Sequence, residues 1–267
     1  SLLICLCFLM AIIVNAKTLT LETEKTIKKD TVLEKLDIKS KGTLTVAEKV
    51  KLTLNSPSSI AGKMILQPGA TLELKFSTPS SLNILSGGLL QVNGSKATPC
   101  MVYAKKGSVV AYLSDGNSKG GGRIVATYCT FKNLGGKPLY RAYEYSPKAN
   151  TGEIKLENCI FDSCFQVKAK QKLSKGSKVS FIGCKWQNSQ EKPKSERRKW
   201  EEWYIHETSA MPGSEAKLIN CDFDKKIGFF HAADYVVEDC VFREGVQCYS
   251  HWCPKWKSFK RNFIRSI

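Results

Sequence analysis

The stretch EIKLENCIFDSC, residues 153–164, places a cysteine, Cys159, two positions before a large aromatic residue, Phe161. Four other stretches have the same order: RIVATYCTFKN (123–133), KVSFIGCKWQN (178–188), EAKLINCDFDK (215–225) and DYVVEDCVFRE (234–244). The repeated pairs are Cys129/Phe131, Cys159/Phe161, Cys184/Trp186, Cys221/Phe223 and Cys240/Phe242. Self-similar units at intervals of tens of residues are typical of solenoids, in which neighbouring units bury one another's apolar faces.

Each unit also predicts a bend in the backbone just before its cysteine. Apolar residues stand five and three positions before the cysteine, as Ile154 and Leu156 do in the 153–164 stretch. Side chains of a strand alternate with a period of two, so an odd interval of three changes the inward face unless the chain bends. The residue before the cysteine is Asn158, Gly183, Asn220 or Asp239, types that tolerate positive φ, with Tyr128 as the exception. Two polar residues follow each aromatic and mark a second turn.

Stacking such units would place cysteine on cysteine and aromatic on aromatic in two ladders. A buried thiol behaves as a small hydrophobe and fits beside a large flat ring. Packing is therefore the favoured role of the repeated cysteines. An occasional disulfide and metal binding stay open, although single cysteines lack the paired C-x2-C spacing of zinc sites.

The N-terminal half shows the same architecture in a different composition. GTLTVAEKVKLTLN (42–55), GKMILQPGATLELKF (62–76) and GGLLQVNGSKATPCMVYAKKG (87–107) each place a glycine before an alternating Leu/Val strand. Helical periodicity is limited to a weak hint over residues 31–37. The chain is predicted to be all-β, in short rungs.

SGGLLQVNGSKATPCMVYAKKG followed by IVATYCTFKNLGG resembles the rungs of right-handed parallel β-helix proteins, which include pectate-lyase-like enzymes and many secreted or surface bacterial proteins. The resemblance covers residues 42–245 and implies an all-β, right-handed parallel β-helix with loop insertions. One interval departs from it, because Cys221 and Cys240 are only 19 positions apart, which is tight for a full coil. A β-sandwich is the alternative fold.

The N-terminus predicts export. Residues 1–16 are apolar, carry no charge and end in Val14-Asn15-Ala16, which is typical of a signal peptide; an uncut membrane anchor is the alternative. We expect three parts: a signal peptide (1–16), an N-terminal segment that caps the first coil (17–41) and the β-helix domain (42–267), whose true C-terminus could lie further on. Nine cysteines lie outside residues 1–16, so at least one is expected to be free or intermolecular.

The net charge of +17, from 41 basic and 24 acidic residues, favours an anionic partner. For an exported chain this is an acidic polysaccharide or another anionic surface polymer rather than nucleic acid. Solubility alone is the alternative explanation of the charge. The expected location is secreted, cell-surface or periplasmic, with no membrane span after the leader is removed.

Two insertions between rungs carry the candidate binding residues. In a solenoid the interior is filled, so ligand contacts fall on an outer sheet and on loops. Aromatic faces stack on sugars, while arginine and lysine bind carboxylates or sulfates. Both insertions are expected to leave from one corner, the turn after the aromatic; the alternative is a solvated insertion that pairs its own charges. The candidates are Arg197, Arg198, Lys199, Trp200, Trp203 and Tyr204 in one insertion, and Tyr140, Arg141, Tyr143 and Tyr145 in the other.

Near the C-terminus, Cys248 and Cys253 predict a local disulfide that closes the last coil, with metal binding by these cysteines and His251 as the weaker alternative. Catalytic residues are not identified, since the N-T-D, D-D and G-H-G strings of polygalacturonases do not occur. No cofactor is expected, except calcium if the chain is a polysaccharide lyase. The sequence therefore predicts a binding solenoid; a lyase or glycoside hydrolase and a structural or adhesive surface protein are the alternatives.

Overall fold

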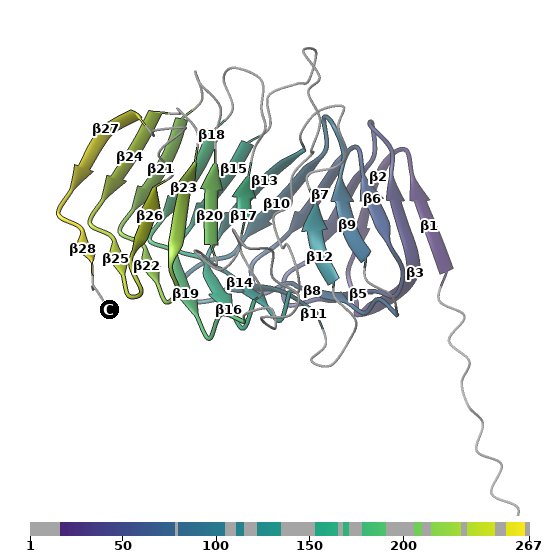
Figure 1. Ribbon diagram of the computed structural model, residues 1–267. Helices are drawn as coiled ribbons and strands as arrows, with labels where there is room; N and C mark the ends of the chain where they lie inside the picture. Colours follow the sequence, from purple (N-terminus) through teal and green to yellow (C-terminus); the bar gives the residue numbers. More distant parts are fainter. Residues whose placement is uncertain are drawn as a thin grey trace, which may run out of the picture.

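The chain folds into parallel β-sheets. The computed structural model describes residues 17–77, 80–104, 111–114, 122–134, 153–164, 168–170, 178–190, 206–209, 215–230, 234–248 and 255–264. These residues form 28 strands and no helix. Every strand pair among them is parallel, which does not fit the β-sandwich alternative and is compatible with a parallel β-helix. Figure 1 shows the strands stacked in rows, with the chain advancing from the purple end at β1 to the yellow end at β27 and β28.

The strands are divided among three sheets. The 14-stranded sheet contains β1 (Lys17–Leu21), β3 (Thr31–Ile38), β5 (Lys51–Leu54), β6 (Ser58–Ile60), β8 (Thr71–Leu74), β9 (Ser80–Ile84), β11 (Cys100–Ala104), β12 (Ala111–Ser114), β14 (Cys129–Lys132), β16 (Ile160–Asp162), β19 (Lys185–Gln187), β22 (Asp222–Phe223), β25 (Val241–Phe242) and β28 (Phe263–Ile264). The 10-stranded sheet contains β2 (Glu24–Ile27), β4 (Thr43–Val46), β7 (Lys63–Leu66), β10 (Leu89–Asn93), β13 (Arg123–Thr127), β15 (Glu153–Glu157), β18 (Lys178–Ile182), β21 (Glu215–Ile219), β24 (Asp234–Glu238) and β27 (Lys255–Lys260). The 4-stranded sheet contains β17 (Lys168–Lys170), β20 (His206–Ser209), β23 (Ile227–Phe230) and β26 (Val246–Cys248).

Strand β3 joins two limbs of the 14-stranded sheet. Its first residues, Thr31–Leu33, pair with β5, whereas Asp37 and Ile38 pair with β6. The first limb runs β3-β6-β9-β12, and the second runs from β5 through β14, β16 and β19 to β28. One turn of the chain, such as β6-β7-β8, therefore contributes one strand to the first limb, one to the 10-stranded sheet and one to the second limb. The 4-stranded sheet takes the place of the first limb in the later turns.

The predicted bend before each cysteine is confirmed. The corner between the 10-stranded sheet and the second limb is a single residue with positive φ: Tyr128 (45°), Asn158 (53°), Gly183 (62°), Asn220 (52°) and Asp239 (56°). Tyr128 adopts this conformation although its residue type disfavours it. The turn after the aromatic also contains residues with positive φ, Asn133, Ser163 and Asn188.

Two expectations about coil boundaries change. The 19-residue interval from Cys221 to Cys240 accommodates a complete coil, because β22, β23 and β24 follow one another within it. The weak helical hint over residues 31–37 is wrong, since this segment forms β3. Strands β1, β2 and β3 already pair within the sheets, so the coil pattern extends through most of residues 17–41.

Two columns of side chains fill the interior along the second limb. The small column runs Ala70, Cys100, Cys129, Cys159, Cys184, Cys221 and Cys240, all buried. The large column runs Leu52, Leu72, Val102, Phe131, Phe161, Trp186, Phe223 and Phe242, also buried. Rings from Phe131 to Phe242 stack face to face with centroids 4.2–5.3 Å apart. Both columns lie where the sequence repeat places its ladders.

Thiols of the small column donate hydrogen bonds to backbone carbonyls of the preceding coil. Cys184 Sγ donates to Leu156 O at 3.3 Å, and Cys240 Sγ donates to Leu218 O at 3.4 Å. Burial raises the pKa of Cys129 and of Cys221 well above the ordinary value. All seven cysteines whose side chains are described are free and buried, which matches a packing role.

Candidate functional site

The two predicted insertions start at the same edge of the second limb. Residues 135–152 follow the turn after β14, and residues 191–205 follow the turn after β19. In the sheet, only β16 separates β14 from β19. With neighbouring strands about 4.8 Å apart, the two departure points lie on the order of 10 Å from each other. We call this edge the insertion corner, comprising residues 132–134, 162–164 and 187–190.

The Asp162 carboxylate at the insertion corner interacts with donor side chains from three successive coils. Asp162 is buried, and its Oδ2 pairs with Lys132 Nζ at 3.0 Å. Its Oδ1 accepts from Asn188 Nδ2 at 2.9 Å and from Ser163 Oγ at 3.2 Å. Lys132, Asp162 and Asn188 belong to the three successive coils that flank the insertions, so this one side chain ties the coils together.

The second half of the corner is held by main-chain bonds and by Asp224. Ser189 is buried, and both its backbone N–H and its hydroxyl donate to Asp224 at 2.8 Å. The N–H of Gln190, the last described residue before the second insertion, donates to Cys164 O at 2.9 Å. Cys164 in turn donates its thiol to Phe131 O at 3.3 Å. The segment that leads into the insertion is therefore fixed on both sides.

This network of Lys132, Asp162, Ser163 and Asn188, which we call the Asp162 brace, has a structural role. Burial alone would raise the pKa of Asp162, but hydrogen bonds from Asn188, Lys132 and Ser163, together with the Lys132 charge, lower it below the usual range. An ionised carboxylate that already accepts three donors is a weak proton acceptor. The network fixes the residues from which the insertions start. The Asp162 carboxylate is not suited to act as a general base.

A second polar group lies on the same limb, nearer the N-terminus, and includes the buried residues Thr53 and Glu73. Lys51 Nζ pairs with Glu73 at 2.7 Å and lies 5.6 Å from the centre of the Tyr103 ring, while Thr53 donates to Glu73 at 3.0 Å. Hydrogen bonds from Lys51 to Glu73 and Tyr103 raise the pKa of Lys51. Lys51 therefore keeps its proton at neutral pH and cannot act as a base there.

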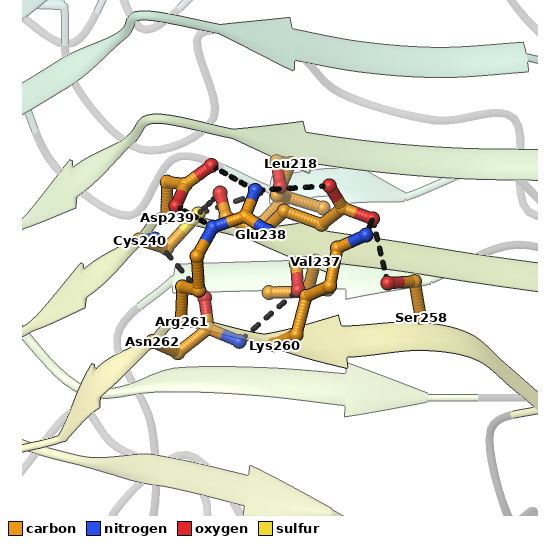
Figure 2. Close-up of polar contacts among 9 residues, drawn as sticks. All are labelled: Leu218, Val237, Glu238, Asp239, Cys240, Ser258, Lys260, Arg261 and Asn262. Atoms are coloured by element: carbon orange, nitrogen blue, oxygen red, sulfur yellow. Dashed lines mark hydrogen bonds and ion pairs between the residues drawn. The ribbon is translucent and has the colours of Figure 1, made fainter.

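The last coil ends the cysteine column with an asparagine (Figure 2). Asn262 stands one coil beyond Cys240; its Oδ1 accepts from the Cys240 N–H at 3.0 Å, and its Nδ2 donates to Val237 O at 3.0 Å. Arg261, with φ 54°, occupies the corner position and binds Asp239 at 2.6 Å. Lys260 pairs with Glu238 at 3.3 Å. The amide thus continues the donor pattern of the thiols, and the basic last coil neutralises the acidic coil before it.

The predicted binding residues, Tyr140, Arg141, Tyr143, Tyr145, Arg197, Arg198, Lys199, Trp200, Trp203 and Tyr204, lie outside the described residues. So does Cys253 of the predicted disulfide, and the side chain of Cys248 is not described. Sequence reasoning did not predict the network at the insertion corner: it placed Asp162 and Asn188 in the polar turns after the aromatics and did not single out Ser189. The polar pair after each aromatic was the available signal for Asp162 and Asn188, whereas Ser189 lies one position beyond its pair.

Within the described part of the chain, no group of three or more His, Cys, Asp or Glu side chains is arranged to hold a metal ion. The same residues include no helix that is long and apolar enough to cross a membrane. No protein-family model matches the chain, and the searches of curated proteins and of solved structures likewise found no match.

Proposed function

We propose that this chain is an exported, right-handed parallel β-helix that binds an anionic polysaccharide at the insertion corner. The observation that carries the proposal is that the two insertions start at one edge, with a single strand between their starting points. One insertion contributes Arg197, Arg198 and Lys199 with nearby aromatics, and the other contributes three tyrosines and Arg141. A polymer lying across this edge would meet both sets.

The chemistry of the two insertions suits a sugar polymer with carboxylate or sulfate groups. Guanidinium groups bind planar anions through paired hydrogen bonds, and aromatic rings cover the apolar faces of sugars. The Asp162 brace supports this use, because a rigid base reduces the ordering cost that the insertions pay on binding.

The polar groups around Asp162 and Lys51 favour binding over catalysis. Asp162 has a lowered pKa and three donors on its carboxylate, and Lys51 has a raised pKa. A lyase needs a base that can accept a proton from the sugar, and neither group meets this need. If the chain is a lyase, calcium is its expected cofactor.

The test is binding of the mature chain to polygalacturonate and to a sulfated polysaccharide by isothermal titration at two ionic strengths. Replacing Arg197, Arg198 and Lys199 together by alanine should weaken binding about 10- to 100-fold, at ~0.5–1 kcal/mol for each exposed charge pair. Raising the salt concentration above about 0.1 M, where the Debye length is about 10 Å, should weaken polysaccharide binding by the wild-type chain.

The matched control removes the same charge elsewhere. Lys25 lies in β2, Lys28 and Lys29 lie between β2 and β3, and all three are exposed. In the stack, β2 lies near the N-terminal end and well away from β14 and β16 (Figure 1). The triple alanine variant of these lysines should bind almost as well as the wild type. Equal losses in both triple variants would show that total charge, and not the corner, determines binding. Release of an unsaturated sugar product during the titration would instead identify a lyase.

A further inference from the structure

One tripeptide outside the cysteine repeats has a chemistry unrelated to packing. Asn93-Gly94-Ser95 is an Asn-x-Ser sequence whose middle residue is not proline, the acceptor sequence for N-linked glycosylation in secreted proteins. The chain has eleven asparagines, and this is the only one followed two positions later by serine or threonine without an intervening proline.

The fold places this tripeptide at the surface. Strand β10 alternates, with Leu90 and Val92 buried and Gln91 and Asn93 partly exposed. Residues 94–99 then form the corner between β10 and β11, whereas the next coil turns the equivalent corner with the single residue Tyr128. The longer corner is closed by its own bonds: the Ser95 and Thr98 hydroxyls lie 2.8 Å apart, and the Thr98 N–H donates to Ser95 Oγ at 3.0 Å.

The Asn93 side chain presents its nitrogen for attachment. Its Oδ1 accepts from Gln91 Nε2 at 2.9 Å, which orients the amide. Its Nδ2 donates to no side chain or carbonyl among the described residues, and it is not enclosed. The glycine between has a separate explanation, because a Cβ at Gly94 would lie 2.2 Å from Tyr128 O. Packing therefore requires Gly94, and Ser95 closes the corner through Thr98, but neither role requires an asparagine at position 93.

We propose that Asn93 carries an N-linked glycan in the exported protein. In the reaction, the anomeric C1–O bond of a polyisoprenyl-pyrophosphate-linked oligosaccharide breaks, and a bond forms between C1 and Asn93 Nδ2. The amide proton passes to a base of the transferase, and the polyisoprenyl pyrophosphate leaves. The inference rests on the export that is part of the proposed function.

The position of the glycan is compatible with the proposed binding site. Asn93 stands where the 10-stranded sheet meets the second limb, while the insertions leave from the other end of the second-limb strands. In β14, for example, Cys129 begins the strand at the first corner and Lys132 ends it at the insertion corner. The glycan would cover one corner and leave the other open.

The experiment expresses the full chain with its own leader in a eukaryotic secretory host and digests the secreted protein with peptide-N-glycosidase in heavy-oxygen water. The peptide that contains residue 93 should then carry aspartate with the heavy oxygen. The Asn93→Gln and Ser95→Ala variants should be secreted without this label, and Ser95→Thr should retain it.

Secreted wild-type protein with unmodified Asn93 would overturn the proposal, and so would a chain retained in the cell with its leader uncut. The same digest gives the N-terminal peptide, which distinguishes these two outcomes. Polysaccharide binding is measured before and after deglycosylation and should not change. Failure of binding with a glycan present would reject the proposed function alone.

Discussion

The two halves of the solenoid turn the same corner in different ways. In the C-terminal half, one residue with positive φ connects the 10-stranded sheet to the second limb, and cysteines and stacked rings fill the space behind it. In the N-terminal half, β4 and β5 are joined by residues 47–50, where the Val50 N–H bonds to Ala47 O, and Leu52 and Leu72 replace the rings. The coil therefore depends on matching corner size with side-chain volume, and not on cysteine or aromatic residues as such.

The largest expected effect comes from removing a ring at the centre of the stack. Trp186 lies 4.8 Å from the Phe161 ring and 4.2 Å from the Phe223 ring, and it is buried. Trp186→Ala should lower the free energy of unfolding by about 4 kcal/mol, because it loses stacking and leaves a cavity. Leu72→Ala, in the same column of the N-terminal half, should cost about 3 kcal/mol. Denaturant titrations compare the two; an unaffected Trp186→Ala variant would contradict the stack.

The next effect is a dependence of stability on pH that comes from a buried thiol of the C-terminal half. Burial raises the pKa of Cys164 from the ordinary 9.0 to about 12. The folded chain keeps this proton while an unfolded thiol loses it, so stability is full below pH 9 and falls as the pH rises toward 12. At pH 11 the loss from this thiol is roughly 3 kcal/mol. Cys164→Ala should lose that part of the alkaline slope. The slope comes from unfolding at pH 8 and pH 11, and an unchanged slope would contradict a buried, protonated thiol.

A smaller effect tests the one-residue corner. Asn158 has φ 53°, and Asn158→Ala should destabilise the chain by about 1 kcal/mol, since alanine tolerates the left-handed region less well. The control is Glu48→Ala, in an exposed N-terminal corner residue that does not have positive φ, which should stay within about 0.5 kcal/mol of the wild type. Equal effects at both sites would mean that the positive φ of Asn158 does not determine the loss of stability.

The smallest effect has the opposite sign. Tyr128 is the corner residue whose type fits its φ of 45° least well. Tyr128→Asn should therefore stabilise the chain by up to ~1 kcal/mol, measured as a rise in the denaturation midpoint. A loss of stability would show that the Tyr128 side chain contributes packing that outweighs the backbone strain.

The same contrast explains how far sequence reasoning could go. The repeats in residues 123–244 predicted the bend, the cysteine column and the ring column, because one-residue corners force a phase change that is visible in the sequence. In residues 17–41 no such signal exists, since Leu/Val alternation alone does not mark where a coil begins. The weak helical hint over residues 31–37 failed because β3 bends across two limbs, which interrupts its alternation.

At the insertion corner, the sequence indicated that both insertions follow the aromatic turn, and the sheet order places one strand, β16, between their starting points. The brace could not be predicted. Asp162 and Asn188 meet only because their coils stack in register, and one sequence by itself does not reveal which polar turn residues face one another.

The most direct test of the account measures the distance between β14 and β19, the two strands that end at the insertion corner. Thr130 on β14 and Lys185 on β19 occupy the same register position, with Ile160 of β16 between them. Spin labels on Thr130→Cys and Lys185→Cys, with each single-label variant as a control for native thiols, should show strong dipolar broadening from Cα atoms on the order of 10 Å apart. A double-labelled spectrum equal to the sum of the single-labelled spectra would contradict the stacked coils and the shared insertion corner.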